Sequence, residues 1–310
     1  MAGVKNSSFA GARISPRSSR PPRRASIAFR GAGRRMILCC AFALAAAPVR
    51  AENWAPNLTL TATWSDNATN ANLASDEISA LHAQADMIAS KRYAAGRDDS
   101  FHVGLHAAAE WWPRYRRLTS GAFGLRGEWQ HKFGLGAFAP VLSLEAGADA
   151  VRAQDGARDG TSAIGTFSLR KRLNAQWRVT LAHDVSEHYA RAAAYDRRGQ
   201  QTTFEVGFDA GEFTRFTVAA FRYEGDVVSY ATPPRPELAA IATARQPSAI
   251  FNRNHIVYSI DARTVGGKAS AVRALDEETA AILSYEYRET ERAPFRYVNH
   301  LVSVAVVHQF

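Results

Sequence analysis

Apolar and polar residues alternate with a period of two over much of the chain beyond residue 56. Between Phe101 and Trp111 every second residue is apolar, and the residues between them include two histidines and Glu110. Such alternation predicts a β-strand with one apolar and one polar face. The pattern returns in 142–150, 177–186, 203–209, 256–263 and 283–288. The chain is therefore predicted to be an all-β protein.

The alternation predicts about twelve strands, at 57–64, 80–89, 100–111, 118–133, 138–150, 161–171, 176–186, 201–210, 213–224, 254–264, 279–289 and 296–310. The 259 residues after Ala51 leave about 22 for each strand and its connection. This spacing suits an up-and-down antiparallel transmembrane β-barrel of roughly ten-residue strands. Because 213–224 alternates poorly and 265–278 leaves room for a further element, ten to fourteen strands remain open.

The lengths of the connections between the predicted strands give an independent indication of the fold. From the fifth to the tenth strand they alternate between long and short, and the longest, 225–253, contains four prolines. Outer-membrane barrels have short periplasmic turns and longer external loops, so the alternation favours a barrel of that class. Three segments depart from it: 90–99 and 265–278 are long where a turn is expected, and 112–117 is short where a loop is expected.

The first 51 residues differ from the rest in composition. They hold Lys5 and nine arginines but no acid, and an apolar run of twelve residues from Met36 to Ala47. A basic region, a short apolar run and small residues before the cut predict a secretory signal peptide cleaved between Ala51 and Glu52. The run is too short to span a bilayer. The stretch before Met36 is either a disordered extension or precedes a later start codon.

The leader also explains the net charge of +9. Residues 52–310 carry 28 bases and 29 acids, so the exported part is close to neutral and a nucleic-acid partner is not predicted. Cys39 and Cys40 both lie in the apolar run, and the exported part contains no cysteine. We therefore predict two regions, a leader with signal peptide at 1–51 and a barrel at 52–310 with the long loop 225–253.

The last residues show a second alternation that ends on an aromatic residue: Val302, Val304, Val306, His308 and Phe310 share one face. This segment resembles the last strand of Gram-negative outer-membrane β-barrel proteins, which typically ends in phenylalanine after alternating apolar residues. His308 departs from that pattern. The resemblance implies an outer-membrane location, contact with outer-membrane lipids, and recognition by the export and barrel-assembly machinery. It names no functional family.

The polar faces of the predicted strands would line the lumen of such a barrel. Acids and bases are interleaved on them, and no ring of one sign stands out that would set ion selectivity. The predicted lumen-lining residues are Arg126, Glu128, Glu145, Asp149, Arg170, Arg178, Asp184, Glu205, Asp209, Asp261, Arg263, Glu286 and Arg288. A barrel of about twelve strands has room for a narrow pore or a packed polar core.

Catalytic groupings are weak. His183, Asp184 and Ser186 supply the residue types of a hydrolase triad, but successive strand residues point to opposite faces, so His183 would face lipid while Ser186 faces the lumen. His102 and His106 would lie about 13 Å apart on a strand, too far to share a metal ion. The Asp66-Asn67 pair fits an extracellular loop better than the site of a lipid hydrolase.

The function predicted from these observations is that of a non-enzymatic outer-membrane barrel, acting as a narrow porin-like channel or as a structural or surface protein. Small solutes are the predicted cargo, with no cofactor and no metal. Two alternatives stay open: a lipid-modifying hydrolase of the phospholipase or lipid A deacylase type, and a soluble periplasmic β-protein.

Overall fold

The computed structural model describes the backbone from Arg50 to Phe310, with side chains from Trp54 onward. Residues 1–49 of the predicted leader, which include the apolar run, lie outside these residues. Ala51 and Glu52, the predicted cleavage site, fall at the beginning of the first strand, where only the backbone is described. The signal peptide therefore stays a prediction.

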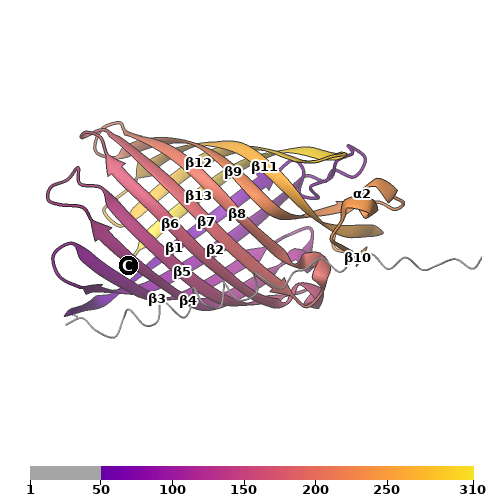
Figure 1. The fold of residues 1–310 in the computed structure, drawn as a ribbon, viewed down its shortest axis with the longest axis horizontal. Coiled ribbons are helices and arrows are strands. Elements are labelled where there is room, and N and C mark those ends of the chain that lie inside the picture. Colours follow the sequence, from indigo (N-terminus) through magenta and orange to yellow (C-terminus); the bar gives the residue numbers. More distant parts are fainter. Residues whose placement is uncertain (1–49) are drawn as a thin grey trace, which may run out of the picture. The chain divides into compact units, whose positions relative to one another are not determined.

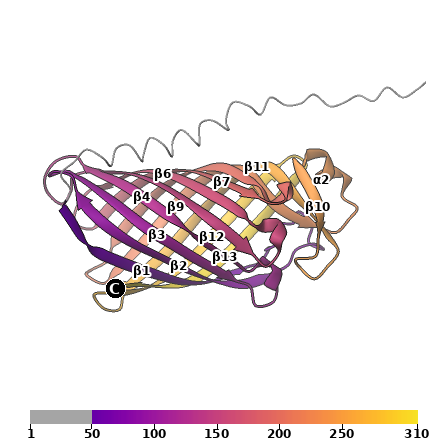
Figure 2. The ribbon, with the colours of Figure 1, turned by 90° about the horizontal axis from the view of Figure 1, so that it is seen from below.

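Twelve antiparallel strands form a closed barrel (Figures 1 and 2). Each strand pairs with the next along the chain, and pairing of the first with the last closes the ring, from Asn57↔Gln309 to Ser65↔Leu301. The short strand β10 pairs beside β11 and stands outside the ring. The strands are β1 (Arg50–Ser65), β2 (Ala80–Ala94), β3 (Asp99–Trp111), β4 (Ser120–Lys132), β5 (Val141–Ala153), β6 (Gly160–Arg172), β7 (Trp177–Ala190), β8 (Arg197–Asp209), β9 (Thr214–Ala231), β10 (Ala244–Ser248), β11 (His255–Ala274), β12 (Thr279–Arg292) and β13 (Phe295–Gln309).

The predicted fold class and strand number are confirmed, and the three irregular connections have simple explanations. β2 continues to Ala94 and β11 to Ala274, so both long segments shrink to short turns. The loop between β3 and β4 gains the single-turn helix η2 (Arg116–Leu118). β9 continues to Ala231, so the first residues of the predicted 225–253 loop are strand. The rest of that loop contains the helix α2 (Pro236–Ile241) and β10.

The outer face of the barrel is apolar and exposed. Large apolar side chains project at alternate positions from every strand of the ring except β11, as expected of a membrane-spanning barrel. Examples are Leu60, Met87, Leu105, Leu125, Leu144, Phe167, Leu181, Phe204, Val218, Leu283 and Val302, each at least 40% exposed. A water-soluble protein rarely exposes a continuous apolar surface of this extent. Among the described residues, no helix is long and apolar enough to cross a membrane.

The end of the barrel that carries α2 and β10 is covered by folded loops, which we call the cap: residues 66–79, 112–119, 191–196 and 232–254. Its core includes Phe251, whose ring lies 4.9 Å from that of Tyr115 and 5.0 Å from that of Tyr230. The helical turn η4 (Ala193–Tyr195) adds two buried residues. Residues far apart in sequence thus share one apolar core at the mouth of the barrel.

The cap segment 66–79 reaches from β1 to β9. The backbone N–H of Tyr230 donates to the carbonyl of Thr69 at 2.9 Å, and Asn70 Nδ2 donates to the carbonyl of Val228 at 2.9 Å. In the ring, β1 and β9 are separated by β11, β12 and β13. The segment therefore crosses part of the barrel opening and narrows it.

Candidate functional site: the polar lumen and its chamber

A buried polar network on β3, β4 and β5 projects to the inner face of the barrel. His106 Nδ1 lies 2.8 Å from Asp149 Oδ1, and His106 Nε2 lies 2.9 Å from Asp86 Oδ2 on β2. Arg126 binds the same aspartate through two nitrogens, with Nη1 donating to Oδ1 at 3.0 Å and Nη2 donating to Oδ2 at 2.8 Å. Paired donors and acceptors of this kind offset the cost of removing the charges from bulk water.

Two glycines make room for this network. Gly124 lies directly between His106 and Asp149 in the strand register, so no side chain separates them across β4. A Cβ atom at Gly124 would collide with the Ala148 carbonyl and the Asp149 carboxylate. Gly147 faces Arg126, and a Cβ there would lie 2.5 Å from Arg126 Nη1. The network therefore depends on the absence of side chains at these two glycines as well as on its charged residues.

Between this network and the cap lies a water-accessible chamber of about 640 Å³. Asn70, Tyr195 and Tyr230 contribute from the cap side. Arg126 and Asp149 contribute from the strands below. Its size lies in the range of small-molecule binding sites, and its walls are largely polar or aromatic. The lumen therefore contains a water-accessible space rather than only packed side chains.

Four arginines and four carboxylates line the chamber: Arg126, Arg158, Arg197, Arg288, Glu110, Asp149, Glu187 and Asp226. Most are engaged with other groups. Glu187 pairs with Arg198 at 3.0 Å, Arg288 pairs with Glu286, and Arg158 Nη1 donates to the carbonyl of Leu118 at 2.7 Å. Numbers of charges are balanced, so any preference for charged solutes depends on which groups remain free.

Three of the predicted lumen residues, Arg126, Asp149 and Arg288, line the chamber. Eight others occur at inward positions of the strand register, outside the chamber: Glu128, Glu145, Arg170, Arg178, Asp184, Glu205, Asp209 and Glu286. Several are paired with neighbours, such as Asp209 with Arg172 at 2.7 Å and Asp184 with Thr166 at 2.7 Å. Whether they line a conducting path stays a prediction.

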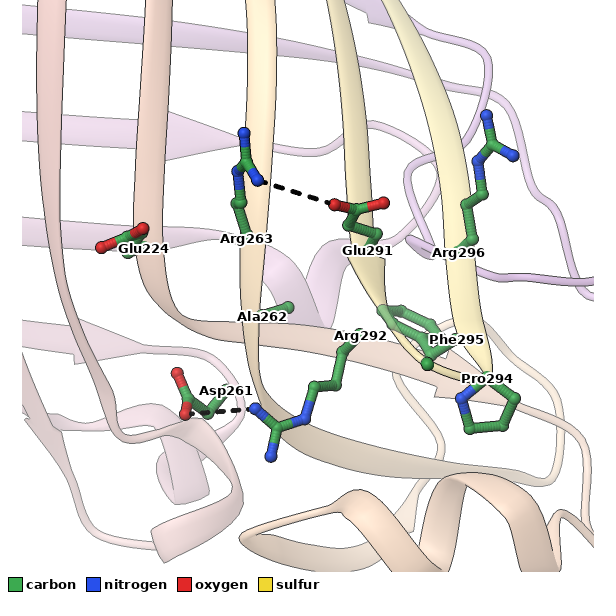
Figure 3. A pocket seen from close by; sticks show the side chains of 10 residues that line it. Glu224, Asp261, Ala262, Arg263, Glu291, Arg292, Pro294, Phe295 and Arg296 are labelled. Carbon is green, nitrogen blue, oxygen red and sulfur yellow. Dashed lines mark ion pairs between the residues drawn. The ribbon is translucent and has the colours of Figure 1, made fainter.

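The other two predicted lumen residues, Asp261 and Arg263, lie elsewhere, and this prediction was wrong. They project opposite Thr264, which lines the chamber, and they border a separate pocket of about 740 Å³ on the outer wall (Figure 3). There Arg263 pairs with Glu291 at 4.0 Å, and Asp261 pairs with Arg292 at 3.7 Å. The sequence assigned the alternate apolar residues of this strand to lipid.

The reason lies in the cap. Tyr258 and Ile260 on β11 are 1% and 0% exposed, because they pack with Leu238 of α2 and with Phe295. They are core residues rather than lipid contacts. The charged residues on the opposite side of β11 therefore face outward. On this part of β11 the apolar face therefore packs against the cap and does not contact lipid.

The weak catalytic groupings are not assembled. His183 Nδ1 lies 3.0 Å from Thr202 Oγ1 on an exposed face, whereas Ser186 lines the chamber. Asp66 accepts a hydrogen bond from the backbone N–H of His300 at 2.8 Å, and Asn67 is 1% exposed and bonded within the cap segment. Within residues 54–310, no group of three or more potential ligands is placed to hold a metal ion.

The predicted assembly signal lies on the outer face of β13. Val302, Val304 and Val306 are exposed, and the Phe310 ring lies 4.6 Å from that of His308. The backbone N–H of Phe310 donates to the carbonyl of Pro56 at 3.0 Å, beside the seam of the barrel. Recognition of this segment by assembly machinery stays a prediction.

Three basic or polar features of the lumen were missed from the sequence: Asp86 in the buried network, and Arg158 and Arg197 in the chamber. Asp86 lies on an inward position of a predicted strand, so its alternation contained the signal. Arg158 lies in the helical turn η3 (Gly156–Arg158) and Arg197 at the beginning of β8. Residues at loop ends have no strand period to assign them to a face.

The chain matches no protein-family model and no curated protein. Among solved structures it is similar to an outer membrane channel from Pseudomonas putida F1, with a TM-score of 0.59 and 9% identity over 86% of this chain and 97% of that one. It is also similar to the KdgM porin in complex with disordered oligogalacturonate (TM-score 0.43, 9% identity, 82% of this chain and 99% of that one). A third is the Pseudomonas putida toluene transporter TodX (TM-score 0.39, 9% identity, 85% and 90%).

At 9% identity, the first likeness bears on fold alone. It agrees with the closed ring of twelve antiparallel strands and with the exposed apolar outer face. The chain has the fold of Gram-negative outer-membrane β-barrels.

Proposed function

We propose that this protein is an outer-membrane channel for small polar solutes, kept narrow by its cap. The observation that carries the proposal is the polar, water-accessible chamber of about 640 Å³ inside a barrel with an apolar outer face. A barrel that served only as a surface scaffold would need no such space. The likeness in fold to an outer membrane channel supports the same function.

The proposed orientation follows from the connections. In barrels of this class the short turns lie in the periplasm and the longer loops outside the cell. The turns 95–98, 173–176, 210–213 and 275–278 are short, whereas the cap contains the long segments 66–79 and 232–254. The cap is therefore proposed to face the exterior, where it controls entry of solutes into the chamber.

The location is tested by fractionating cells that produce the full chain and by comparing heated and unheated samples in electrophoresis. A folded barrel resists detergent at room temperature and migrates differently from its heated form. Recovery in the outer-membrane fraction with such a shift is the expected result. Recovery in the soluble periplasmic fraction would exclude a membrane channel.

Channel function is tested with the purified barrel in planar bilayers. We expect small, discrete conductance steps in potassium chloride, because the cap narrows the opening. The same preparation is incubated with phospholipid vesicles, and fatty acid release is measured. Absence of current would exclude the channel, and release of fatty acid would favour the lipid hydrolase instead.

A further inference from the structure

Three basic side chains meet in the upper part of the chamber. Arg158 ends η3, while His188 on β7 and Arg197 on β8 are cross-strand partners. All three line the chamber, and each arginine lies within electrostatic reach of the histidine and of the other arginine. The like charges of Arg158 and Arg197 repel one another, so their arrangement costs free energy in the empty protein.

Arg197 has unused hydrogen-bonding capacity. Of the eight charged residues that line the chamber, it is the one for which the described part of the chain supplies no hydrogen bond and no ion pair. Its guanidinium group offers five N–H donors in a planar fork. The residue is exposed and lines the chamber. Its free N–H donors are therefore available to bind an anion in the chamber.

The acidic groups of the chamber do not fill this role. Asp149 is taken by Arg126 and His106, and Glu187 by Arg198. Asp226 accepts a hydrogen bond from the backbone N–H of Arg198 at 3.1 Å, and Glu110 accepts one from Ser120 at 3.4 Å.

Glu110 is the carboxylate whose charge acts on Arg197, but no ion pair forms between them. The positive cluster therefore persists beside these acids.

We propose that Arg197, with Arg158 and His188 beside it, binds the carboxylate group of a small organic anion in the chamber. The inference rests on the proposed channel function and names its solute class. A guanidinium fork matches the two oxygens of a carboxylate. The half-buried rings of Phe221 and Tyr223 line the same space and offer apolar surface to the remainder of the solute. A volume of about 640 Å³ accommodates a molecule of the size of benzoate.

Binding is measured by titration calorimetry on the purified, folded full-length barrel in detergent, with benzoate, benzyl alcohol and benzylamine as probes. The three share one ring and differ in charge. Benzoate is expected to bind, and the neutral and cationic probes are not. Arg197→Gln should weaken benzoate binding tenfold or more, because a hydrogen-bonded charge pair is lost. Arg197→Lys, which keeps the charge without the fork, should give an intermediate affinity.

Arg263→Gln is the matched control, since it removes one positive charge from the outer wall. It should leave benzoate affinity unchanged. Unaltered benzoate affinity in Arg197→Gln, with its heat-dependent electrophoretic shift intact, would overturn the proposed site. Equal binding of all three probes would also overturn it.

Conductance on the same preparations separates this inference from the channel proposal. Current without benzoate binding would exclude the proposed anion site but not the proposed channel function. Benzoate binding that depends on Arg197, without current, would exclude channel function and support a barrel that binds solute without conducting it.

Discussion

His106 on β3 and Asp149 on β5 are in direct contact, 2.8 Å apart, although a whole strand, β4, lies between theirs. The contact exists because the intervening position on the inner face is Gly124. Arg126, two residues further along β4, then closes over the aspartate. Three adjacent strands are thus tied together inside the lumen by side chains as well as by their backbone ladders.

The first prediction concerns Gly124. Gly124→Ala should strongly destabilise the barrel or alter its inner wall, because the added methyl group collides with the backbone of β5 and with Asp149. Gly127→Ala on the same strand is the control, since nothing lies within 4 Å of its Cβ position. The temperature at which each variant loses its folded electrophoretic form measures the effect. Equal temperatures for both variants would show that Gly124 is not a spacer.

The second prediction concerns the charge on Asp149. Asp149→Asn keeps the shape of the side chain but removes its charge, so the interactions with Arg126 and His106 weaken. We expect a loss of about 1.5–3 kcal/mol in unfolding free energy, as for a hydrogen bond to a charged partner. Asp184→Asn, where the hydrogen-bond donor is the uncharged Thr166 hydroxyl, should cost less. Denaturant unfolding in detergent or lipid measures both, and an equal cost would contradict the special role of the network.

The third prediction concerns the core of the cap. Phe251 is 2% exposed and contacts Tyr115, Tyr230 and His255. Phe251→Ala should loosen the cap, with a local cost of about 3–5 kcal/mol, and should raise the single-channel conductance. Phe138→Ala is the control, because that ring is 50% exposed in the turn between β4 and β5. Conductance that stays the same in Phe251→Ala would show that the cap does not limit flow.

The fourth prediction concerns acid pH. Asp76 Oδ2 lies 2.9 Å from Arg235 Nη2, and this pair joins the cap segments 66–79 and 232–254. Burial raises the pKa of Asp76, but hydrogen bonds from Arg235 and Thr232 outweigh it, so the pKa lies below its ordinary value of 3.8. A depressed pKa stabilises the folded cap above the unfolded value, and this contribution is lost as the pH falls through the folded pKa.

Hydrogen exchange of residues 232–254 tests this as the pH falls below about 3.8, the unfolded reference. Exchange protection in the wild type should fall in that range. Arg235→Gln should show less protection at neutral pH and a smaller further loss on acidification, because the pair is already broken. An identical acid response in the variant and the wild type would mean that other carboxylates control the cap.

Alternation along the chain was sufficient to predict an all-β barrel of about twelve strands, since a period of two is a property of each strand by itself. It placed eleven of the thirteen predicted lumen residues at inward positions of the register, Arg126 and Asp149 among them. The signal was local, and residues such as Phe101 and Leu105 carried it without reference to their partners. The period also shows why His183 and Ser186 cannot meet on one face.

Only the tertiary structure decided which face of β11 is outside. Alternation gives two faces, but it does not say whether an apolar face meets lipid or a folded cap, and Asp261 and Arg263 were misplaced for that reason. The crossing of the mouth by Asn70 depends on contacts with residues about 160 positions away. The gathering of Arg158, His188 and Arg197 likewise depends on tertiary contact, because the turn η3 between β5 and β6 comes to lie beside the β7–β8 hairpin that pairs His188 with Arg197. Such contacts are set by barrel closure and side-chain packing, and neither has a period along the chain.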